Sequence, residues 1–342
     1  MTSATIAICM ATFEPQFGLL RRQVESIRAQ TERDFVCIVS DDASSDATYA
    51  EIGRLCEGDP RFSLSRGDRR VGFYRNFERA LALVPRGVRY VALSDQDDIW
   101  ERDKLSVLAA ALREPSVLLA YSDMRIVATD GTVVAPSYWT DRRNNFTNLG
   151  SLLLVNTVTG AASLFRRELL DDALPFPSVP GEAYHDHWLA CVALARGRIA
   201  FVERPLHDYV QHGANVVGRH EPMPDELKGG LVRALRRFAR NPVRRARNTA
   251  VHARRYYMDE VRPRRVFAAE LERRIGRAAP PSKRRVLRRV ARLGAPRSVL
   301  WLLARSARDV SGDSETLGLE NQLVKGIVWS WLHPREARRP TG

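Results

Sequence analysis

The chain has 342 residues, of which 44% are hydrophobic, so it can form one large domain or two ordinary ones with buried cores. No segment approaches the ~18–20 continuous apolar residues of a membrane-spanning helix, which argues against such a helix. The N-terminus lacks the charged region and the cleavage site of a secretory signal, so we expect no signal peptide.

The net charge of +14 is concentrated in the C-terminal part. Residues 228–308 contain 25 Lys and Arg but 4 Asp and Glu, a local net charge of +21 that leaves −7 for the rest of the chain. This asymmetry indicates a polyanionic partner. The charge alone leaves that partner open as anionic lipid, nucleic acid or a phosphorylated substrate.

The four cysteines have no spacing typical of metal ligands. Cys9 and Cys37 lie inside apolar runs, where a thiol behaves as a small core side chain. We therefore expect reduced, buried thiols, which are typical of a cytosolic protein.

Residues 1–125 alternate between short apolar runs and segments with helical spacing. The expected strands are 5–10, 35–40, 62–65, 89–93 and 117–121, and the expected helices are 19–28, 48–56, 76–84 and 104–112. This alternation is typical of a mostly parallel, doubly wound sheet with helices on its faces.

Residues 126–215 are less regular. We expect a short strand at 200–202 that ends in a turn at Pro205, and a helix over 187–195. Beyond Pro222 the sequence changes to Arg-rich helical segments interrupted by prolines. We therefore place a domain boundary near residue 220, between a region 1–220 and a basic helical region 221–342.

Three carboxylates occur within four residues, at Asp95, Asp97 and Asp98, directly after the apolar run 90–93. Open α/β sheets bind ligands at this end of their strands. Carboxylates so close together repel one another, and a hard divalent cation relieves the repulsion. The alternative is a helix N-terminus, where acidic residues are common.

Polar residues also follow the first two expected strands. Thr12 and Glu14 follow the first, and the segment 41–46 follows the second. Asp42 can accept hydrogen bonds from a nucleobase or a ribose, whereas the alternative is that the segment only caps the next helix. Because these strand ends lie at the same sheet edge as the acidic cluster, we expect them to meet in one crevice.

Three further residues are candidates for the site. Arg75 follows the flexible Gly72 and can contact a phosphate, or it is a solvated surface charge. Asp186, which has a histidine on each side, can act as a general base or cap the following helix. His212 can add an imidazole ligand to a metal, or it is an ordinary polar loop residue.

Together these segments resemble glycosyltransferase family 2, whose members have the GT-A fold. The resemblance covers about residues 1–218 and rests on segments in the family's order, at 6–14, 41–46, 72–76, 94–100, 185–188 and 211–215. The string 94–100 is typical of a bacterial subgroup that includes many rhamnosyltransferases of surface polysaccharides. Glu14 occupies a position where the family more commonly has Asn.

The resemblance implies a GT-A (Rossmann-like), mostly parallel mixed sheet flanked by helices. It implies an inverting transfer of a sugar, rhamnose among the candidates, from a nucleotide-diphosphate sugar to a hydroxyl of a growing, lipid-linked bacterial surface glycan. It makes Asp186 the base. It assigns to the donor Thr12, Glu14, Asp42, Arg75 and Asp95, and to a Mg²⁺ or Mn²⁺ ion Asp95, Asp97 and His212.

Two other functions stay open. A nucleic-acid-binding protein acting through residues 228–308 would need aromatic residues interleaved on the basic surface, and Tyr256 with Tyr257 is the one such pair there, so nucleic acid is not an expected partner. A metal-dependent nucleotidyltransferase typically has a Gly-rich, basic loop after the first strand, and residues 11–18 form no such loop.

The C-terminal region carries apolar residues at helical spacing among its arginines. They are Leu231, Leu235 and Phe238; then Val286, Leu287, Val290 and Leu293; then Leu323, Val324, Ile327, Val328 and Trp331, with Trp329 beside them. Basic amphipathic helices suit an anionic membrane surface, although these residues can instead pack on the catalytic domain. We expect a cytoplasmic protein that docks peripherally on the inner face of the membrane.

Overall fold

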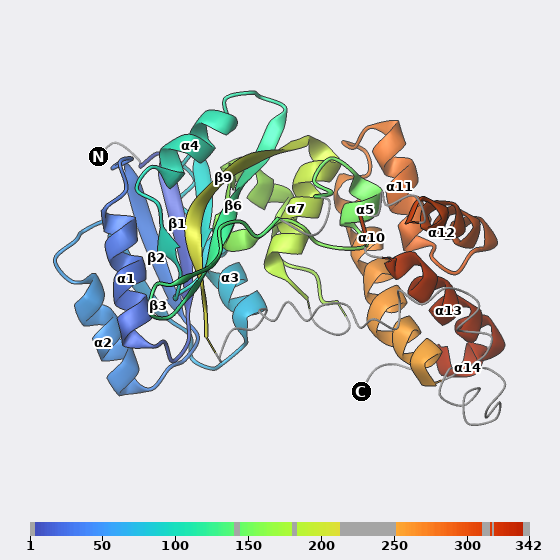
Figure 1. Cartoon of the computed structure of the whole chain (residues 1–342), viewed down its shortest axis with the longest axis horizontal. Helices are drawn as coiled ribbons and strands as arrows, with labels where there is room; N and C mark the ends of the chain where they lie inside the picture. Colours follow the sequence, from blue (N-terminus) through green and yellow to red (C-terminus); the bar gives the residue numbers. More distant parts are fainter. Residues whose placement is uncertain are drawn as a thin grey trace.

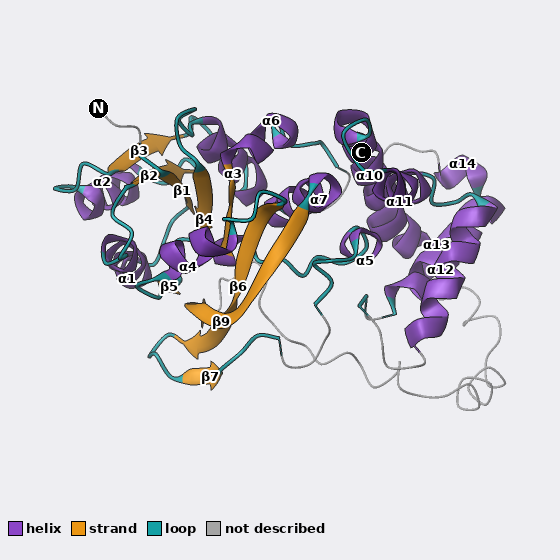
Figure 2. Cartoon of the chain, turned by 90° about the horizontal axis from the view of Figure 1, so that it is seen from above, coloured by secondary structure: helices purple, strands orange, loops and turns teal. Residues whose placement is uncertain are grey.

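A twisted mixed sheet forms the centre of the computed structural model, which describes residues 4–139, 144–179, 183–212, 251–309, 315–316 and 318–337. Its strands are β1 (Ile6–Thr12), β2 (Phe35–Asp41), β3 (Phe62–Arg66), β4 (Tyr90–Ser94), β5 (Ile99–Trp100), β6 (Val117–Ala128), β7 (Val133–Ala135), β8 (Ser163–Arg166) and β9 (Arg198–Gln211). The order across the sheet is β3-β2-β1-β4-β8-β6-β9-β5, and β7 pairs with β6 (Figure 2).

The first four strands of this order run parallel to one another. β8 then runs antiparallel to both β4 and β6, whereas β6 and β9 are parallel. The predicted mostly parallel mixed sheet is therefore confirmed. Because β1, β2 and β4 are parallel neighbours, their carboxyl ends open at one edge of the sheet.

Helices cover both faces of the sheet (Figure 1). Alternate residues of β1 face opposite cores, because side chains in a strand point to alternate sides. Ile6, Ile8 and Met10 pack in one core with α1 (Phe17–Arg28), α2 (Asp46–Cys56) and α4 (Lys104–Ala111). Ala7 and Cys9 pack in the other core with α3 (Phe73–Ala82) and α7 (His185–Arg196). The short helices are α5 (Leu149–Leu152), η1 (Gly160–Ala162), η2 (Arg167–Leu169) and α6 (Leu170–Ala173).

β9 is one long strand, so the predicted turn at Pro205 is wrong. Its register against β6 shifts where Ser122 pairs with Val202 and Asp123 pairs with Pro205. A bulge of this kind accommodates proline, which has no N–H to donate to the ladder. The continued strand delivers His212 to the side of the acidic loop.

The C-terminal helices pack beyond α7, at the end of the molecule farthest from α2 (Figure 1). They are the π-helix η4 (Tyr256–Val261), α10 (Arg262–Ile275), α11 (Pro281–Ala291), α12 (Pro296–Asp309), α13 (Leu319–Leu332) and α14 (Pro334–Ala337). A helical C-terminal region is therefore confirmed. The predicted boundary near residue 220 and the stripe of Leu231, Leu235 and Phe238 lie outside the described residues.

α10 is joined to α7 through a shared core. Phe267 of α10 stacks on His187, with 4.9 Å between ring centroids, and meets Trp188 edge-on. Arg264 donates from two of its nitrogens to the carbonyl oxygen of Leu154. The C-terminal helices thus extend the hydrophobic core behind α7.

All four cysteines are buried and free, as the sequence predicted. None of the helices in the described ranges has the length and apolar character needed to cross a bilayer.

Candidate active site

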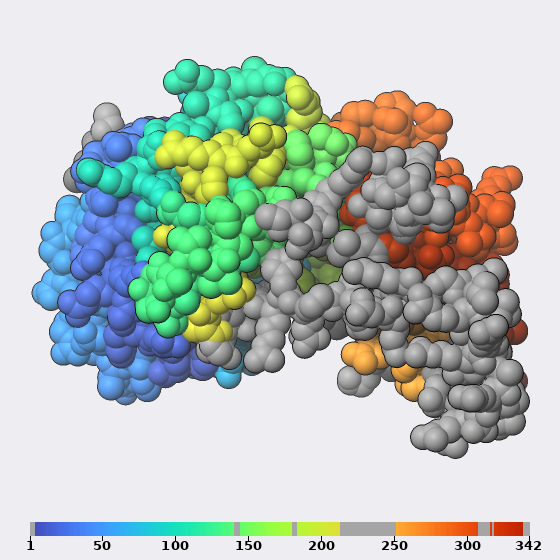
Figure 3. Space-filling view, in the orientation of Figure 1, coloured from blue at the N-terminus to red at the C-terminus, as the bar shows by residue number. Residues whose placement is uncertain are grey.

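A cavity of about 850 Å³ opens at the carboxyl ends of β1, β2 and β4. It brings together most of the residues that the sequence singled out: Thr12, Glu14, Asp42, Asp95, Asp97, Asp186 and His212. The space-filling view in Figure 3 shows one face of the molecule, where residues of the N-terminal and middle parts of the chain lie against one another. A cavity of this size can hold a nucleotide-sized ligand.

The acidic loop follows β4 directly and precedes the short strand β5, so it does not begin a helix. Burial, together with the neighbouring charges of Asp97 and Asp186, raises the pKa of Asp95 to about 7. Asp97 Oδ2 lies 2.8 Å from His212 Nε2. Carboxylates crowded in this way repel one another, which is a condition that favours metal binding.

The donor set fits a divalent cation only in part. Two carboxylates and an imidazole suit Mn²⁺, and two carboxylates suit Mg²⁺. However, among the residues that the structure describes, no group of three or more His, Cys, Asp and Glu side chains is placed so that it could hold a metal ion. The remaining ligands would have to come from the substrate and from water, as is usual for Mg²⁺ beside phosphates.

Gln96, between the two predicted metal ligands, joins the acidic loop to the end of β1. Its Oε1 accepts from the Phe13 N–H at 2.9 Å, and its Nε2 donates to the Phe13 carbonyl oxygen at 3.3 Å. Gln96 was not among the residues predicted from the sequence. The sequence feature that could have indicated Gln96 is its position between two acidic residues.

Asp42 shapes the wall opposite the acidic loop. Its two carboxylate oxygens accept from the N–H groups of Val71 and Gly72, at 2.9 and 2.7 Å. Gly72 has a φ of +83°, which favours glycine, and it immediately precedes α3. Thr12 lies beside this group and donates to Asp41 at 3.2 Å.

Glu14 lines the cavity, but its carboxylate caps α2. Oε1 accepts from the Ser45 N–H at 2.6 Å, and Oε2 accepts from the Thr48 hydroxyl at 2.8 Å. These hydrogen bonds hold the pKa of Glu14 below its usual range. The φ of Glu14 is +38°, a conformation that Asn adopts more readily than Glu.

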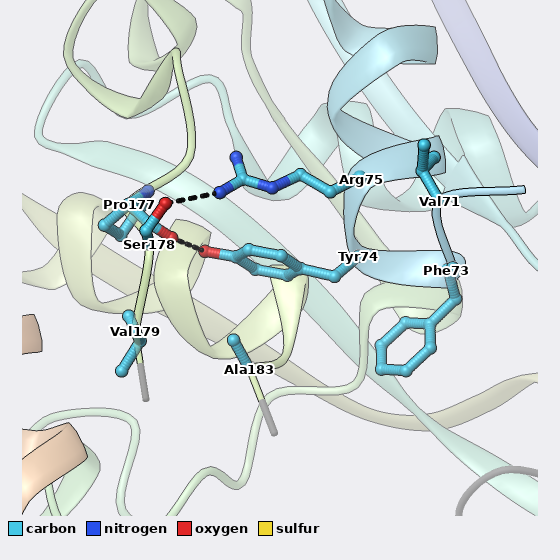
Figure 4. A pocket seen from close by; sticks show the side chains of 9 residues that line it. Val71, Phe73, Tyr74, Arg75, Pro177, Ser178, Val179 and Ala183 are labelled. Atoms are coloured by element: carbon cyan, nitrogen blue, oxygen red, sulfur yellow. Dashed lines mark hydrogen bonds between the residues drawn. The ribbon is translucent and has the colours of Figure 1, made fainter. Parts of the chain in front are cut away.

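Arg75 is not in this cavity. It lines a separate hollow of about 360 Å³ that shares Gly72 and Phe73 with the main cavity. Its guanidinium bonds Glu78, the Phe176 carbonyl oxygen and the Ser178 hydroxyl, the last of which is visible in Figure 4. Its positive charge is therefore already paired within the protein.

A different arginine, Arg70, lines the main cavity. Its guanidinium lies over the ring of Phe13, 4.0 Å from the ring centroid. Arg70 was not predicted from the sequence, although it lies two residues before Gly72, which marked this turn.

Asp186 is the second residue of α7 and points into the cavity, so it is not the N-cap. Its carboxylate accepts from the N–H of His187 at 2.6 Å, from Asn156 Nδ2 at 3.1 Å and from the Gly160 N–H at 3.2 Å. Burial nevertheless raises its pKa to about 6. The group is thus an oriented carboxylate that can take up a proton near neutral pH.

The histidines on either side of Asp186 are neutral. Burial lowers the pKa of His185 to about 3, and its ring stacks on Phe77 with 3.8 Å between centroids. Burial also lowers the pKa of His187 to about 4, and its Nε2 donates to the Leu152 carbonyl oxygen at 2.6 Å. These residues fix the start of α7 rather than supply charge.

The fold and this site define an α/β protein with a ligand cavity at the carboxyl ends of its parallel strands. Residues 7–174, a little under half of the chain, match the family model described as glycosyl transferase family 2. The fold is GT-A-like. The crystal structure of S. aureus TarS 1-349 in complex with UDP-GlcNAc aligns over 96% of this chain and 92% of that one, with a TM-score of 0.52 and 14% identity.

Curated relatives match a little over half of the chain. An uncharacterized glycosyltransferase of Nostoc sp. is 26% identical over 207 residues, which are 57% of this chain and 62% of the relative. An uncharacterized protein of Mycobacterium bovis is 28% identical over 204 residues, 58% of this chain and 56% of the relative. The chain therefore spans about three fifths of the length of these relatives.

A third relative has a described reaction. It is the UDP-Glc:α-D-GlcNAc-diphosphoundecaprenol β-1,3-glucosyltransferase WfgD of Escherichia coli, which is 25% identical over 193 residues. The match covers 56% of this chain and 70% of that protein.

Proposed function

We propose that this protein is an inverting glycosyltransferase that moves a sugar from a nucleotide-diphosphate sugar to an acceptor hydroxyl. The observation that carries the proposal is the placement of Asp186 in the same cavity as Asp95 and Asp97. The match of residues 7–174 to the glycosyl transferase family 2 model supports it. One end of the cavity offers acids for a metal and a diphosphate, and another offers a buried carboxylate for a hydroxyl.

The chemistry assigns a distinct role to Asp186. The acceptor oxygen attacks the anomeric carbon as the bond from that carbon to the diphosphate oxygen breaks, and the nucleoside diphosphate leaves with the electron pair. Asp186 takes the proton of the hydroxyl. Attack on the face opposite the leaving group inverts the anomeric centre. A carboxylate whose pKa is about 6 is ionised at neutral pH and basic enough for this step.

Asp95, Asp97 and His212 are the residues that would hold Mg²⁺ or Mn²⁺. When bound, such an ion neutralises the negative charge that develops on the leaving diphosphate. The short distance between Asp97 and His212, and the raised pKa of Asp95, support this assignment.

For the donor, we propose that Asp42 and Thr12 lie against the nucleoside, with Asp95 near the ribose or the metal. The carboxylate of Glu14 is occupied by α2, so we propose that Glu14 acts through its backbone and the shape of the turn. Arg75 was predicted to bind the donor, but its place in the neighbouring hollow favours a role outside the nucleotide site.

The acceptor and the sugar are finer proposals. WfgD acts on a diphosphoundecaprenol-linked sugar, which supports a lipid-linked acceptor in bacterial surface-glycan synthesis. Rhamnose as the donor sugar rests on the resemblance of the segment 94–100 to rhamnosyltransferases.

Release of the nucleotide product tests the reaction class. The protein is incubated with a panel of nucleotide sugars, Mn²⁺ or Mg²⁺ and lipid-linked or free saccharides. We expect a nucleoside diphosphate and a new glycosidic bond with the anomeric configuration opposite to that of the donor. Release of pyrophosphate would instead identify a nucleotidyltransferase, and a retained configuration would remove the inverting mechanism.

We also propose that the C-terminal helices hold the enzyme on an anionic membrane surface. Most of the predicted stripe residues do not face outward, because Leu287, Val290, Leu293, Leu323 and Ile327 are buried in the protein. Val328 and Trp331 of the last predicted stripe are exposed, as are Leu332 on α13 and Leu300 and Leu303 on α12. We call this set the α12–α13 apolar surface.

The two helices of this surface run antiparallel. Arg305 and Ser306 of α12 bond Glu320 and Asn321 of α13, whereas Trp331, near the other end of α13, donates to the Gly294 carbonyl oxygen just before α12. Exposed basic residues accompany them, at Arg292, Arg297, Lys325 and Arg335. Apolar side chains with basic neighbours complement a bilayer with anionic headgroups.

A further inference from the structure

The side chain of Lys104 is completely buried behind the cavity. It is the first residue of α4, and its ammonium group donates to the carbonyl oxygen of Ala161. The same ammonium lies over the ring of Trp100, 3.7 Å from the ring centroid. A buried ammonium is costly unless specific partners compensate it, so its contacts here are informative.

The acidic loop acts on this side chain electrostatically. Asp98 is also completely buried, and the negative charges of Asp98 and Asp95 partly oppose the effect of burial, which lowers the pKa of Lys104 well below its usual range. His207 of β9 lies on the other side of Asp98, with 3.8 Å between its Nε2 and Asp98 Oδ2. Lys104 therefore links η1 to Trp100, which follows the loop that carries the predicted metal ligands.

The carbonyl that Lys104 binds belongs to η1, the short helix behind Asp186. The N–H of Gly160, the residue before Ala161, donates to Asp186 Oδ2 at 3.2 Å. The packing there is tight, because a Cβ on Gly160 would lie 2.9 Å from His185 Nε2 and 3.1 Å from Asp186 Cβ. A displacement of η1 would therefore alter the hydrogen bonding and the position of Asp186.

We infer that Lys104 is a positioning residue, which ties η1 to Trp100 at the end of the acidic loop and so fixes the distance between Asp186 and the metal-binding end of the cavity. This inference rests on the proposed function in one respect, that Asp186 is the base. Transfer requires the acceptor oxygen and the leaving diphosphate to lie on opposite sides of one carbon. A misplacement of about 1 Å between the groups that hold them costs roughly 10²-fold in rate.

The test removes the tether without leaving a lone buried charge. Lys104→Met alone strands the Asp98 carboxylate and can prevent folding, so the decisive variant is Lys104→Met with Asp98→Asn. Asp98→Asn alone controls for the change in the loop. Lys325→Met, an exposed lysine on α13, is the matched control for loss of a lysine. Hydrogen exchange of the peptide covering residues 157–165 and of a peptide from β2 is measured by mass spectrometry.

In the double variant we expect exchange in 157–165 to rise by about tenfold or more while exchange in β2 is unchanged. We expect kcat to fall ~10–10²-fold, and the Kd for the donor nucleotide diphosphate with Mn²⁺ to stay within about threefold. Asp98→Asn and Lys325→Met should retain the slow exchange of the wild-type peptide.

If the peptide 157–165 exchanges at the wild-type rate in the double variant, the inference that Lys104 holds η1 in place is wrong. Recovery of full kcat in the double variant would mean that Lys104 only balances the charge of Asp98. Loss of donor affinity with kcat unchanged would place Lys104 in the donor site instead. The exchange measurement needs no turnover, so it decides on the tether even if the proposed transferase reaction fails.

Discussion

Two buried carboxylates of the cavity differ in what surrounds them. The pKa of Asp186 is raised to about 6 by burial alone, against three hydrogen bonds that lower it. The pKa of Asp95 is raised to about 7, partly by the charges of two other acids. A cation bound beside Asp95 would offset the repulsion from Asp97 and Asp186 and would therefore lower the pKa of Asp95. Burial and charge thus give the proposed base and the proposed metal ligand different surroundings within one cavity.

Asp186→Asn should lower kcat by ~10²–10⁴ and leave donor affinity nearly unchanged, because the amide keeps the shape of the side chain but cannot take up the proton. Steady-state kinetics and donor titration in Mn²⁺ measure the two effects. A collapse of donor affinity with kcat retained would make Asp186 a binding or structural residue.

The pH dependence of kcat should report the same group. The base works when ionised, and its pKa is raised to about 6, so kcat should be level above pH ~7 and fall about tenfold per pH unit below ~6. A carboxylate with an ordinary pKa would keep kcat level down to pH ~5. A profile that stays level to that pH therefore contradicts the assignment.

Asp97→Asn should abolish the activation by Mn²⁺ or Mg²⁺, since losing one charged ligand costs several kcal/mol of transition-state stabilisation. Activity is measured across a metal titration, with circular dichroism to verify the fold. Asp171→Asn, an exposed acid distant in sequence from the acidic loop, is the control and should titrate like the wild type. Normal metal-dependent activity of a folded Asp97→Asn protein would remove Asp97 from the metal site.

The sequence predicted the residues whose role depends on where a strand ends. Asp42, Asp95 and Asp97 follow apolar runs, and parallel pairing brings such ends together whatever the details of packing. Roles that depend on side-chain direction could not be predicted in this way. Glu14 turns toward α2 because of its positive φ, and Arg75 lies on the far side of Phe73; neither property is visible in the spacing of residues.

Among the elements, α2 shows how a predicted site residue can serve the fold. Its N-cap is Ser45, whose side chain accepts from the Thr48 N–H, and Glu14 adds an acceptor for the Ser45 N–H. A carboxylate at a helix N-terminus also interacts favourably with the helix dipole. Glu14 therefore links the end of β1 to the start of α2.

Glu14→Gln should lower the free energy of unfolding by at most about 1 kcal/mol, because the carboxylate is exposed and solvent screens its interactions. Urea unfolding measures this change, and donor titration should give a Kd within about twofold of the wild type. A tenfold weaker donor affinity with unchanged stability would restore Glu14 to the nucleotide site.

β9 shows why the middle of the chain was harder to predict than the first 125 residues. Pro205 interrupts the apolar pattern and indicates a turn, yet the strand continues because a bulge against β6 removes the need for its N–H. That compensation comes from a strand about 80 residues away. Lys104 is similar, since nothing local marks a lysine at a helix start as fully buried.

At the scale of the whole molecule, the N-terminal and C-terminal regions share a core. Phe267, Leu271 and Ile275 of α10 belong to the same buried cluster as Trp188 of α7. The division at residue 220 stays a prediction, and the shared core implies that the two regions stabilise each other. The helical stripes predicted α11 and α13 correctly, but the stripes alone could not show whether protein or lipid covers them.

Binding to anionic vesicles should depend on the α12–α13 apolar surface. Leu300 and Leu303 are 66% and 46% exposed, so Leu300→Asn with Leu303→Asn should leave the fold intact. Inserting each leucine into a bilayer recovers about 1 kcal/mol, so the double variant should bind about 10–30-fold more weakly. Leu83→Asn, at the end of α3 with 49% exposure, is the matched control.

Co-sedimentation with anionic and neutral vesicles at low and high salt measures this binding. The wild type and the Leu83→Asn variant should bind anionic vesicles more strongly than neutral ones. Salt should weaken this binding, because each nearby Lys or Arg contributes ~1 kcal/mol before screening. If vesicle binding still depends on the two leucines but does not change with salt, the basic residues have no role in membrane binding. Absent binding, or equal binding of the wild type and the double variant, would mean that these helices only complete the core behind α7.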